Sequence, residues 1–581
     1  MIYAKPLIPA LLVLMLVAVG SLKKRADLPR PLASTALGRL GFGLAKLCLL
    51  VLPLEWLLHL FSNADPLAVS PKAVWLAALA QSCQLLLAVT GMADVVTGIA
   101  GLLGMAVEEP HAAACRAGSF SGLWRRLMPG MISGGKVNAM QCVPVLVLVA
   151  GVSALWHGTV QGVSVWFVIH YLLLMAEGAR RKPLFSPLPL PVQVILVLLI
   201  LLLSSVLLLA PNAAAALESW KLMFSEVKPT VYSLLMNKRL TSSWLQWVVF
   251  ISMLTCVALP RLGWLLELPI ITWRIIGMVL ILPSLLLVVR EVRALPDSIR
   301  QAAQWPVTWL FNEGNTRVHV GYDGWLYPHR ELDRRTLKRT GHQGLTEPLL
   351  ELAAELKSRN IPLMLVAAPA KMALYPENVL RAEYAAPVQP PGHKARLEKL
   401  SAAGIDVVDP APALWERLLK AESHYMADSH WTFETMKEVA GAVARRIREK
   451  HPQLYVAETP VINATILERS EAGDLARDLL PQGSDFLFPA EHEQLISIRG
   501  LPQDSRSPVL IAGDALLEVF EQPEASFGNA DGTRQSAGFS MQLAILLGRP
   551  VAEQLTTDVT ALKTAAEGRK LVILVVSADD L

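Results

Sequence analysis

Long apolar runs are confined to the first half of the chain. Eight segments come close to the roughly 20 residues that a helix needs to cross a membrane; they are residues 7–22, 42–61, 74–91, 141–157, 162–178, 190–210, 244–260 and 264–289. Residues 92–107 are also apolar, but they are rich in glycine and contain Asp94. We expect a short or re-entrant segment there that faces protein, because lipid would leave its backbone and carboxylate unsatisfied. The pattern predicts a multi-span membrane domain over residues 1–290.

The second half alternates short apolar runs with amphipathic ones. Strands are expected after the turn at 321–324, and at 361–368, 405–408, 509–512 and 571–576; helices are expected at 345–359, 395–403, 432–450 and 539–547. Such alternation predicts an α/β domain, a parallel sheet with helices on both faces. Ligands of such sheets bind at the carboxyl ends of the strands.

Composition supports this division. The chain has 581 residues, too many for one ordinary domain, and 53% are hydrophobic while 18% are charged. A net charge of +4, without a basic stripe interleaved with aromatics, argues against a nucleic-acid partner. All five cysteines precede residue 257 and lack metal-ligand spacing, so we expect no disulfide or Cys-ligated metal in the second half.

Basic clusters orient the apolar segments. Residues 23–25, 125–126 and 180–182 are rich in lysine and arginine, and such clusters favour the cytoplasmic side. The first cluster follows the apolar run at 7–22, which favours a retained helix over a cleaved signal peptide. Counting spans from these clusters predicts a multi-pass protein of a bacterial inner membrane, with its C-terminal domain in the periplasm.

A histidine stands at the end of one apolar run, in the segment Ser153–Gly158, which includes Trp156 and His157. A histidine beside a membrane span needs a partner or a task. It could simply cap or pack the helix. It could also have a chemical task together with its surroundings. These are Val89–Asp94, Leu102–Gly104, Ser119–Arg126 and Trp166–His170.

In this order, the segments resemble the C-terminal part of membrane-bound O-acyltransferases (MBOAT) of the alginate O-acetylation branch, over about residues 85–180. The resemblance implies that His157 occupies the active-site position, where it could act as general base toward an acyl acceptor. Residues 127–135 depart from the family, which continues there with Trp-His and a long run ending near Pro-Leu-Gly-Gly. Much of a loop thought to face the acyl donor is missing, which puts intact catalysis in doubt.

Two segments of the second half contain candidate catalytic residues. One precedes an expected helix and the other follows an expected strand. Asp428 and His430 are two residues apart, a spacing at which a carboxylate can orient an imidazole for base catalysis. Alternatively, Asp428 or Ser429 caps the helix that follows. The strand at 509–512 runs into Gly513-Asp514, and such a turn commonly presents a nucleophile next, with backbone N–H groups as an oxyanion hole.

Together with Asp323–Leu326, Pro369–Lys371 and Leu374–Pro376, these residues resemble the SGNH-like (AlgX/AlgJ-like) domain of alginate O-acetylation proteins. The resemblance covers residues 315–581, after a linker at 291–314. It implies that Asp428 and His430 are catalytic, that Gly513 and Asp514 shape the oxyanion hole, and that a serine follows. The residue present is Ala515, so the chain is either an engineered serine-to-alanine variant or a natural pseudoenzyme. Serines downstream (Ser526, Ser536 and Ser540) fit structural roles.

The two resemblances imply O-acetylation of an exported polysaccharide, with acyl groups passed across the membrane to the SGNH-like domain. Acetyl-CoA or another acyl donor would be a substrate, and no bound cofactor or metal is expected. Expected partners are the polysaccharide, the acyl donor, other polysaccharide synthesis or modification subunits, and membrane lipid. The alternative is an inactive glycan-binding or scaffold subunit of such a complex.

Overall fold

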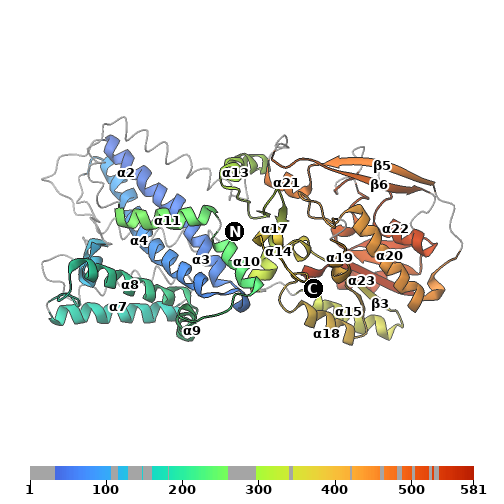
Figure 1. The fold of residues 1–581 in the computed structure, drawn as a ribbon, viewed down its shortest axis with the longest axis horizontal. Coiled ribbons are helices and arrows are strands. Elements are labelled where there is room, and N and C mark those ends of the chain that lie inside the picture. The colour runs from blue at the N-terminus through green and yellow to red at the C-terminus, as the bar shows by residue number, and fades with distance from the viewer. Residues whose placement is uncertain are drawn as a thin grey trace. The chain divides into compact units, whose positions relative to one another are not determined.

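The computed structural model describes residues 33–105, 116–127, 147, 160–180, 182–241, 243–258, 296–338, 344–418, 422–457, 463–480, 487–499, 504–522, 526–528 and 535–581. The chain divides into two compact units, Met1–Gln304 and Trp305–Leu581. The first unit is helical and the second contains the strands (Figure 1).

Apolar helices build the first unit. Its elements are α2 (Ala33–Ala45), the π-helix η1 (Lys46–Val51), α3 (Leu52–Ser62), η2 (Pro66–Ala68), α4 (Pro71–Leu102), α5 (Phe120–Leu127), α7 (Val160–Arg180), α8 (Leu190–Leu209), α9 (Ala213–Met223), α10 (Val231–Leu240) and α11 (Ser243–Ala258). Within the described residues, 4 helices are long and apolar enough to cross a membrane: Ala36–Ser62, Pro71–Leu102, Gln161–Arg180 and Leu190–Leu209.

These four helices contain the apolar segments predicted at 42–61, 74–91, 162–178 and 190–210. The segment predicted at 244–260 falls in α11, which has only 16 residues. Those at 7–22 and 264–289 lie outside the described residues, as do His157 and, apart from Val147, the segment at 141–157.

The expected re-entrant segment at 92–107 is wrong, because α4 continues unbroken through Asp94 to Leu102. The carboxylate is buried against protein, as expected, and pairs with Arg39 (2.7 Å) and Lys46 (2.5 Å). Cations from α2 and η1 thus satisfy the charge without a break in the helix. Close packing makes this contact possible, because a Cβ at Gly98 would lie 2.6 Å from the backbone nitrogen of Leu40.

A five-stranded parallel sheet organises the second unit. Its strand order is β4 (Asp406–Val408), β3 (Leu363–Ala368), β9 (Leu571–Ser577), β7 (Val509–Gly513) and β8 (Ala552–Leu555). β9 is central, and pairs Val366 with Val575 on one side and Ile511 with Ile573 on the other. The predicted α/β class is confirmed, and only β8 was missed among these strands.

Helices cover both faces of the sheet. α15 (Thr346–Ser358), α18 (His393–Ala402) and α23 (Val559–Ala565) pack through Leu352, Leu400 and Leu562 onto one apolar face. Figure 1 shows α20 (Phe433–Lys450) and α22 (Phe539–Leu547) on the other side. Neighbouring strand residues such as Leu365 and Val366 are therefore both buried, which explains the unbroken apolar runs in the sequence.

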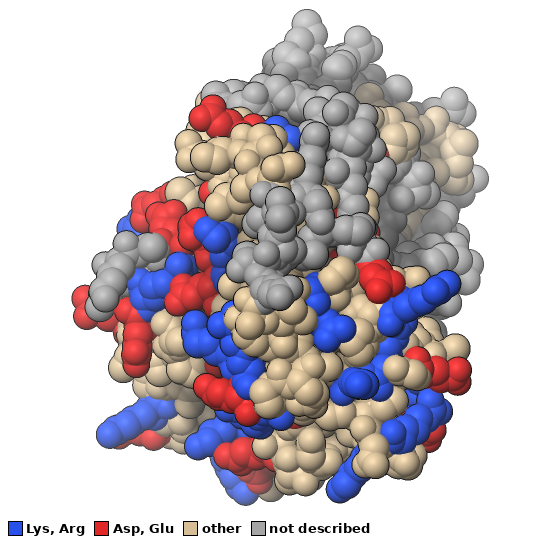
Figure 2. All heavy atoms as spheres, turned by 90° about the vertical axis from the view of Figure 1, so that its right-hand side faces the viewer, with Lys and Arg blue, Asp and Glu red and all other residues tan. Residues whose placement is uncertain are grey.

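Smaller elements lie outside the sheet and its covering helices. They are α13 (Asp297–Phe311), within the expected linker, β1 (Val318–Val320), β2 (Leu326–Pro328), α14 (His329–Thr336), α16 (Lys371–Leu374), α17 (Glu377–Leu380), α19 (Ala411–Arg417), η5 (Pro452–Leu454), β5 (Asn463–Glu471), α21 (Asp474–Leu479), β6 (Glu491–Arg499), η6 (Ala515–Leu517) and η7 (Ala578–Asp580). β5 and β6 form a long antiparallel hairpin. On the face of the molecule in Figure 2, basic and acidic side chains are interspersed.

Gly513, at the end of β7, has no space for a side chain. A Cβ there would collide with the carbonyl oxygen of Val575 on the central strand. We expect Gly513→Ala to lower the free energy of unfolding of the second unit by about 1–3 kcal/mol, since overpacking forces the strands apart. Calorimetry of the full chain in detergent would measure this. Gly441→Ala is the control, because its Cβ would meet only Arg445 at 3.7 Å; equal destabilisation by both changes would contradict the expectation.

Candidate functional site

Asp428 and His430 lie in contact in the loop before α20. The Nδ1 atom of His430 lies 2.7 Å from Oδ1 of Asp428, and the backbone N–H of His430 donates to the same oxygen at 3.0 Å. The Asp428 side chain is fully buried, while that of His430 is 18% exposed. The carboxylate therefore fixes the imidazole through Nδ1 and leaves Nε2 as the nitrogen available for proton transfer.

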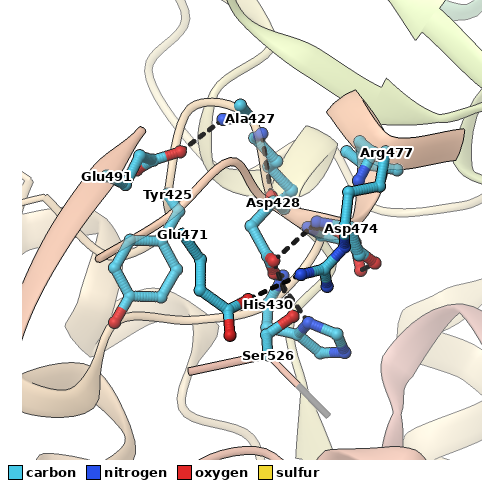
Figure 3. Close-up of polar contacts among 12 residues, drawn as sticks. Tyr425, Ala427, Asp428, His430, Glu471, Asp474, Arg477, Glu491 and Ser526 are labelled. Carbon is cyan, nitrogen blue, oxygen red and sulfur yellow. Dashed lines mark hydrogen bonds and ion pairs between the residues drawn. The ribbon is translucent and has the colours of Figure 1, made fainter. Parts of the chain in front are cut away.

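The second oxygen of Asp428 is also occupied. Oδ2 accepts hydrogen bonds from the Ser526 hydroxyl (2.6 Å) and the backbone N–H of Asp474 (2.9 Å) (Figure 3). Ser526 is thus hydrogen-bonded to the Asp428 carboxylate, which agrees with the structural role expected for this serine. Thr432 caps α20 by accepting from the N–H of Thr435, so the alternative role of Asp428 or Ser429 as the cap of that helix is wrong.

These contacts shift both pKa values. Burial alone would raise the pKa of Asp428, but the charge of His430 and the hydrogen bonds from His430, Ser526 and Asp474 hold it well below its usual range. Burial would lower the pKa of His430, but the negative charge of Asp428 outweighs it and raises that pKa. The pair therefore favours an ionised carboxylate that supports a proton on the imidazole.

A buried lysine donates hydrogen bonds to backbone carbonyls of the loop that contains Asp428. Lys371 follows β3, and its Nζ donates to the carbonyl oxygens of Leu326 (2.5 Å), Met426 (2.7 Å) and Asp428 (3.1 Å). The ammonium also lies 5.0 Å from the ring centroid of Trp325. Burial lowers the pKa of Lys371 to about 8, against the charges of nearby carboxylates.

Carboxylates from the β5–β6 hairpin hold the opposite side of the loop. Glu491 accepts hydrogen bonds from the backbone N–H groups of Met426 (3.0 Å) and Ala427 (2.5 Å). The hydroxyl of Tyr425 donates to Glu493 at 2.5 Å. Side chains distant in sequence thus satisfy several of the loop's backbone donors and acceptors.

Asp474 also contacts the loop that contains Asp428. Its carboxylate accepts from the N–H (2.7 Å) and the hydroxyl (2.6 Å) of Ser429. Gly473 has a φ of 78°, and a Cβ there would collide with the carbonyl of Ala427. Only glycine allows this close approach without strain.

Asp428, His430 and Asp474 also form a group of potential metal ligands. However, N–H and O–H donors already occupy both oxygens of Asp428 and both of Asp474. A cation would have to displace these donors. The donor pattern suits a proton-transfer site better than a metal centre.

The end of β7 lies at the same edge of the sheet. β3 and β7 flank β9, so their ends are about 10 Å apart across the sheet. Asp514 is the N-cap of η6 and accepts from the N–H of Leu516 at 3.0 Å; Ala515 begins η6. Burial raises the pKa of Asp514, which the charge of Arg330 opposes, and the same guanidinium acts on the pKa of His430. One cation of α14 is therefore within electrostatic range of both segments.

The structure thus brings Asp428 and His430 together and places Gly513, Asp514 and Ala515 at the same edge. Their catalytic roles stay predictions, as does that of His157. The sequence did not reveal the positioning role of Lys371, Asp474 or Glu491. Lys371 appeared only within the segment Pro369–Lys371 of the family resemblance. Gly473-Asp474, a turn signal before a short helix, could have drawn attention to Asp474.

Known proteins resemble this half of the chain. Residues 318–558 match the family described as "SGNH hydrolase-like domain, acetyltransferase AlgX". The "Probable alginate O-acetylase AlgJ" of Pseudomonas aeruginosa is 30% identical over 218 residues, which cover 37% of this chain and 54% of that protein. Its counterpart from Pseudomonas fluorescens is 28% identical over 257 residues, 42% of this chain and 60% of that protein. The matches thus span between half and two thirds of these relatives.

Among solved structures, the O-acetyltransferase domain of Pseudomonas putida AlgJ is 17% identical, with a TM-score of 0.35, over 45% of this chain and 91% of that one. The similarity of the C-terminal half to AlgX/AlgJ-like SGNH acetyltransferase domains agrees with the resemblance expected from the sequence. The resemblance of residues 85–180 to membrane-bound O-acyltransferases stays a prediction.

Lys371 gives a direct test of how the loop is held. Lys371→Met keeps the length of the side chain but leaves the carbonyls of Leu326 and Asp428 without the Lys371 donor, at about 1 kcal/mol or more each. The Met426 carbonyl still accepts from the backbone N–H of Leu326 at 2.9 Å. We expect the second unit to lose about 2 kcal/mol of stability, measured by calorimetry of the full chain. Lys399→Met, which removes an exposed ion pair to Glu347, should change it by less than about 1 kcal/mol. Similar small effects of both changes would show that the loop does not depend on the buried ammonium.

Proposed function

We propose that the second unit is an acyltransferase module for O-acetylation of an exported polysaccharide, whose nucleophile position is occupied by Ala515. The observation that supports this most directly is the buried, fully hydrogen-bonded Asp428 beside His430, at the sheet edge where β7 ends. The names of the relatives make alginate the first candidate acceptor.

With serine at position 515, the chemistry would proceed in two steps. The serine hydroxyl attacks an acetyl ester or thioester, His430 takes the hydroxyl proton at Nε2, and the leaving group departs with that proton. A sugar hydroxyl then attacks the acyl-serine, His430 takes its proton and passes it to the departing serine oxygen, and the serine hydroxyl is regenerated. Backbone N–H groups near Gly513 and Asp514 would stabilise the oxyanion of each tetrahedral intermediate. Asp428 orients the imidazole and stabilises its charged form.

The first unit would supply the acyl group. Its four membrane-length helices associate the chain with a membrane, and we propose that the C-terminal half lies in the periplasm of a Gram-negative cell. His157 would then serve the transfer of acyl groups from acetyl-CoA or another donor across the membrane. Other polysaccharide modification subunits would complete the complex.

A second function is favoured by Ala515 itself. A methyl side chain has no atom that can carry the acyl group, so this chain cannot form an acyl-enzyme at 515. The protein could instead hold glycan or partner subunits without turnover. This alternative predicts that glycan binding to the purified chain is unaffected by His430→Ala.

Restoring the nucleophile separates the two functions. We expect Ala515→Ser to hydrolyse p-nitrophenyl acetate and to gain the mass of one acetyl group, detected on the intact protein by mass spectrometry. Ala515→Gly, which also changes the size at 515 but adds no hydroxyl, should show neither. A folded Ala515→Ser protein without either signal would count against the acyltransferase module and favour the binding function.

The pH dependence of the restored activity should report the Asp428–His430 pair. General-base catalysis needs neutral His430, so activity rises as pH increases through the raised pKa of the imidazole. In Ala515→Ser with Asp428→Asn, the loss of the negative charge should move this rise to lower pH and reduce kcat/KM by about 100-fold or more. The pH profile of kcat/KM measures both. An unmoved profile would show that Asp428 does not set the pKa of the catalytic base.

A further inference from the structure

Helix α13 carries an exposed apolar face. Ile299 (46%), Trp309 (58%) and Leu310 (61%) are among its most exposed side chains. At 3.6 residues per turn, the apolar residues that share this side fall within an arc of about 140°. We call this set the α13 stripe: Ile299, Ala302, Trp305, Pro306, Trp309 and Leu310.

The opposite side of α13 is packed. Ala303 and Val307 are buried, and the hydroxyl of Thr308 donates to the carbonyl of Glu313 at 2.9 Å. At the edge of the stripe, Trp305 is half-buried and packs against an apolar cluster: Val318, Val320, Leu326, Ala427, Leu475, Ala476, Leu479, Leu480 and Phe488. The orientation of the helix is therefore set by its inner side, and the exposed stripe results from that orientation.

The composition of the stripe fits one kind of surface. Two stacked indole rings, Trp305 and Trp309, lie with centroids 5.9 Å apart. Tryptophan concentrates at membrane–water interfaces, where its ring sits at the level of the headgroups. The charged residues of the helix, Asp297 and Arg300, lie outside the arc. An exposed apolar stripe that contains tryptophan suits the plane of a membrane–water interface.

The position of α13 in the chain points to the same partner. Four membrane-length helices lie among the described residues, and α13 begins shortly after the span expected at 264–289. A bilayer is therefore tethered close to this helix at all times. A water-soluble partner would have to compete with lipid at very high local concentration.

We propose that α13 lies in the membrane–water interface, with the α13 stripe at the boundary between lipid headgroups and acyl chains. The apolar cluster that Trp305 contacts includes Ala427, the neighbour of Asp428. An anchored α13 would therefore keep the Asp428–His430 loop close to the membrane surface, where acyl groups delivered through the membrane would emerge. The anchoring itself does not depend on the proposed acetylation.

Depth-dependent quenching tests this directly. The full chain, with its five cysteines replaced by alanine, is placed in phosphatidylcholine–phosphatidylglycerol nanodiscs and given one cysteine labelled with bimane. Nitroxide lipids carry the quencher either at the headgroup or deep in the acyl chain. We expect the label at Leu310→Cys to be quenched by headgroup nitroxide at least threefold more than the label at Lys357→Cys, which lies on the exposed, polar side of α15.

Leu199→Cys, in the middle of α8, is the matched control for depth and should be quenched most by the acyl-chain nitroxide. Labels at Ile299→Cys and Ala302→Cys should follow Leu310→Cys. The proposal is overturned if Leu310→Cys is quenched no more than Lys357→Cys. Accessibility to iodide in water would then mean that the stripe faces solvent, and protection from iodide that a protein surface covers it.

Discussion

The buried ammonium of Lys371 is the interaction on which the candidate site depends most. It lies at the end of β3 and binds three backbone carbonyls, two of them from the segment that contains Asp428. That segment has no regular ladder to satisfy its backbone, so its polar groups need partners from elsewhere. Glu491 and Asp474 supply acceptors for its N–H groups, and Lys371 supplies the donor for its carbonyls. Charges of opposite sign on the two sides of one loop hold it in a single conformation.

This arrangement explains how Asp428 can remain buried and ionised. Each carboxylate oxygen receives two hydrogen bonds, and the nearby ammonium adds a favourable charge. A buried carboxylate without these partners would be neutral at physiological pH. Such a costly arrangement is typical of functional sites. It is present here although position 515, where the family resemblance implies a serine, holds alanine.

Elements that leave a local pattern in the sequence could be predicted. Features that depend on partners distant in the sequence could not. The strands of the sheet and the helices on its faces were predictable because burial on both faces leaves an unbroken apolar run, as at β3 and β9. β8 was missed because it is short and includes Glu553 and Gln554. The hairpin was missed because most side chains of β5 are exposed, so its sequence lacks an alternating apolar pattern. The break expected near Asp94 was wrong, because its partners come from a different helix.

The candidate site, too, could be predicted only where its residues are close in the sequence. Asp428 and His430 could be recognised because they are two residues apart. Lys371, Asp474 and Glu491 reach the loop from 45 or more residues away in the chain, and no local pattern connects them. The carboxyl edge of the sheet was predictable as the location, since parallel strands end together there. The contacts that Lys371, Asp474 and Glu491 make with the loop were not predictable.

The O-acetyl content of the exported polysaccharide is the most direct measure of the central claim, that the second unit lacks only its nucleophile. A deletion strain would be complemented by this chain, by Ala515→Ser, and by Ala515→Ser combined with His430→Ala. We expect acetyl groups to return with Ala515→Ser alone, and to require His157 in the same background. Equal acetyl content in all complemented strains would contradict the claim and identify the chain as a catalytically silent component.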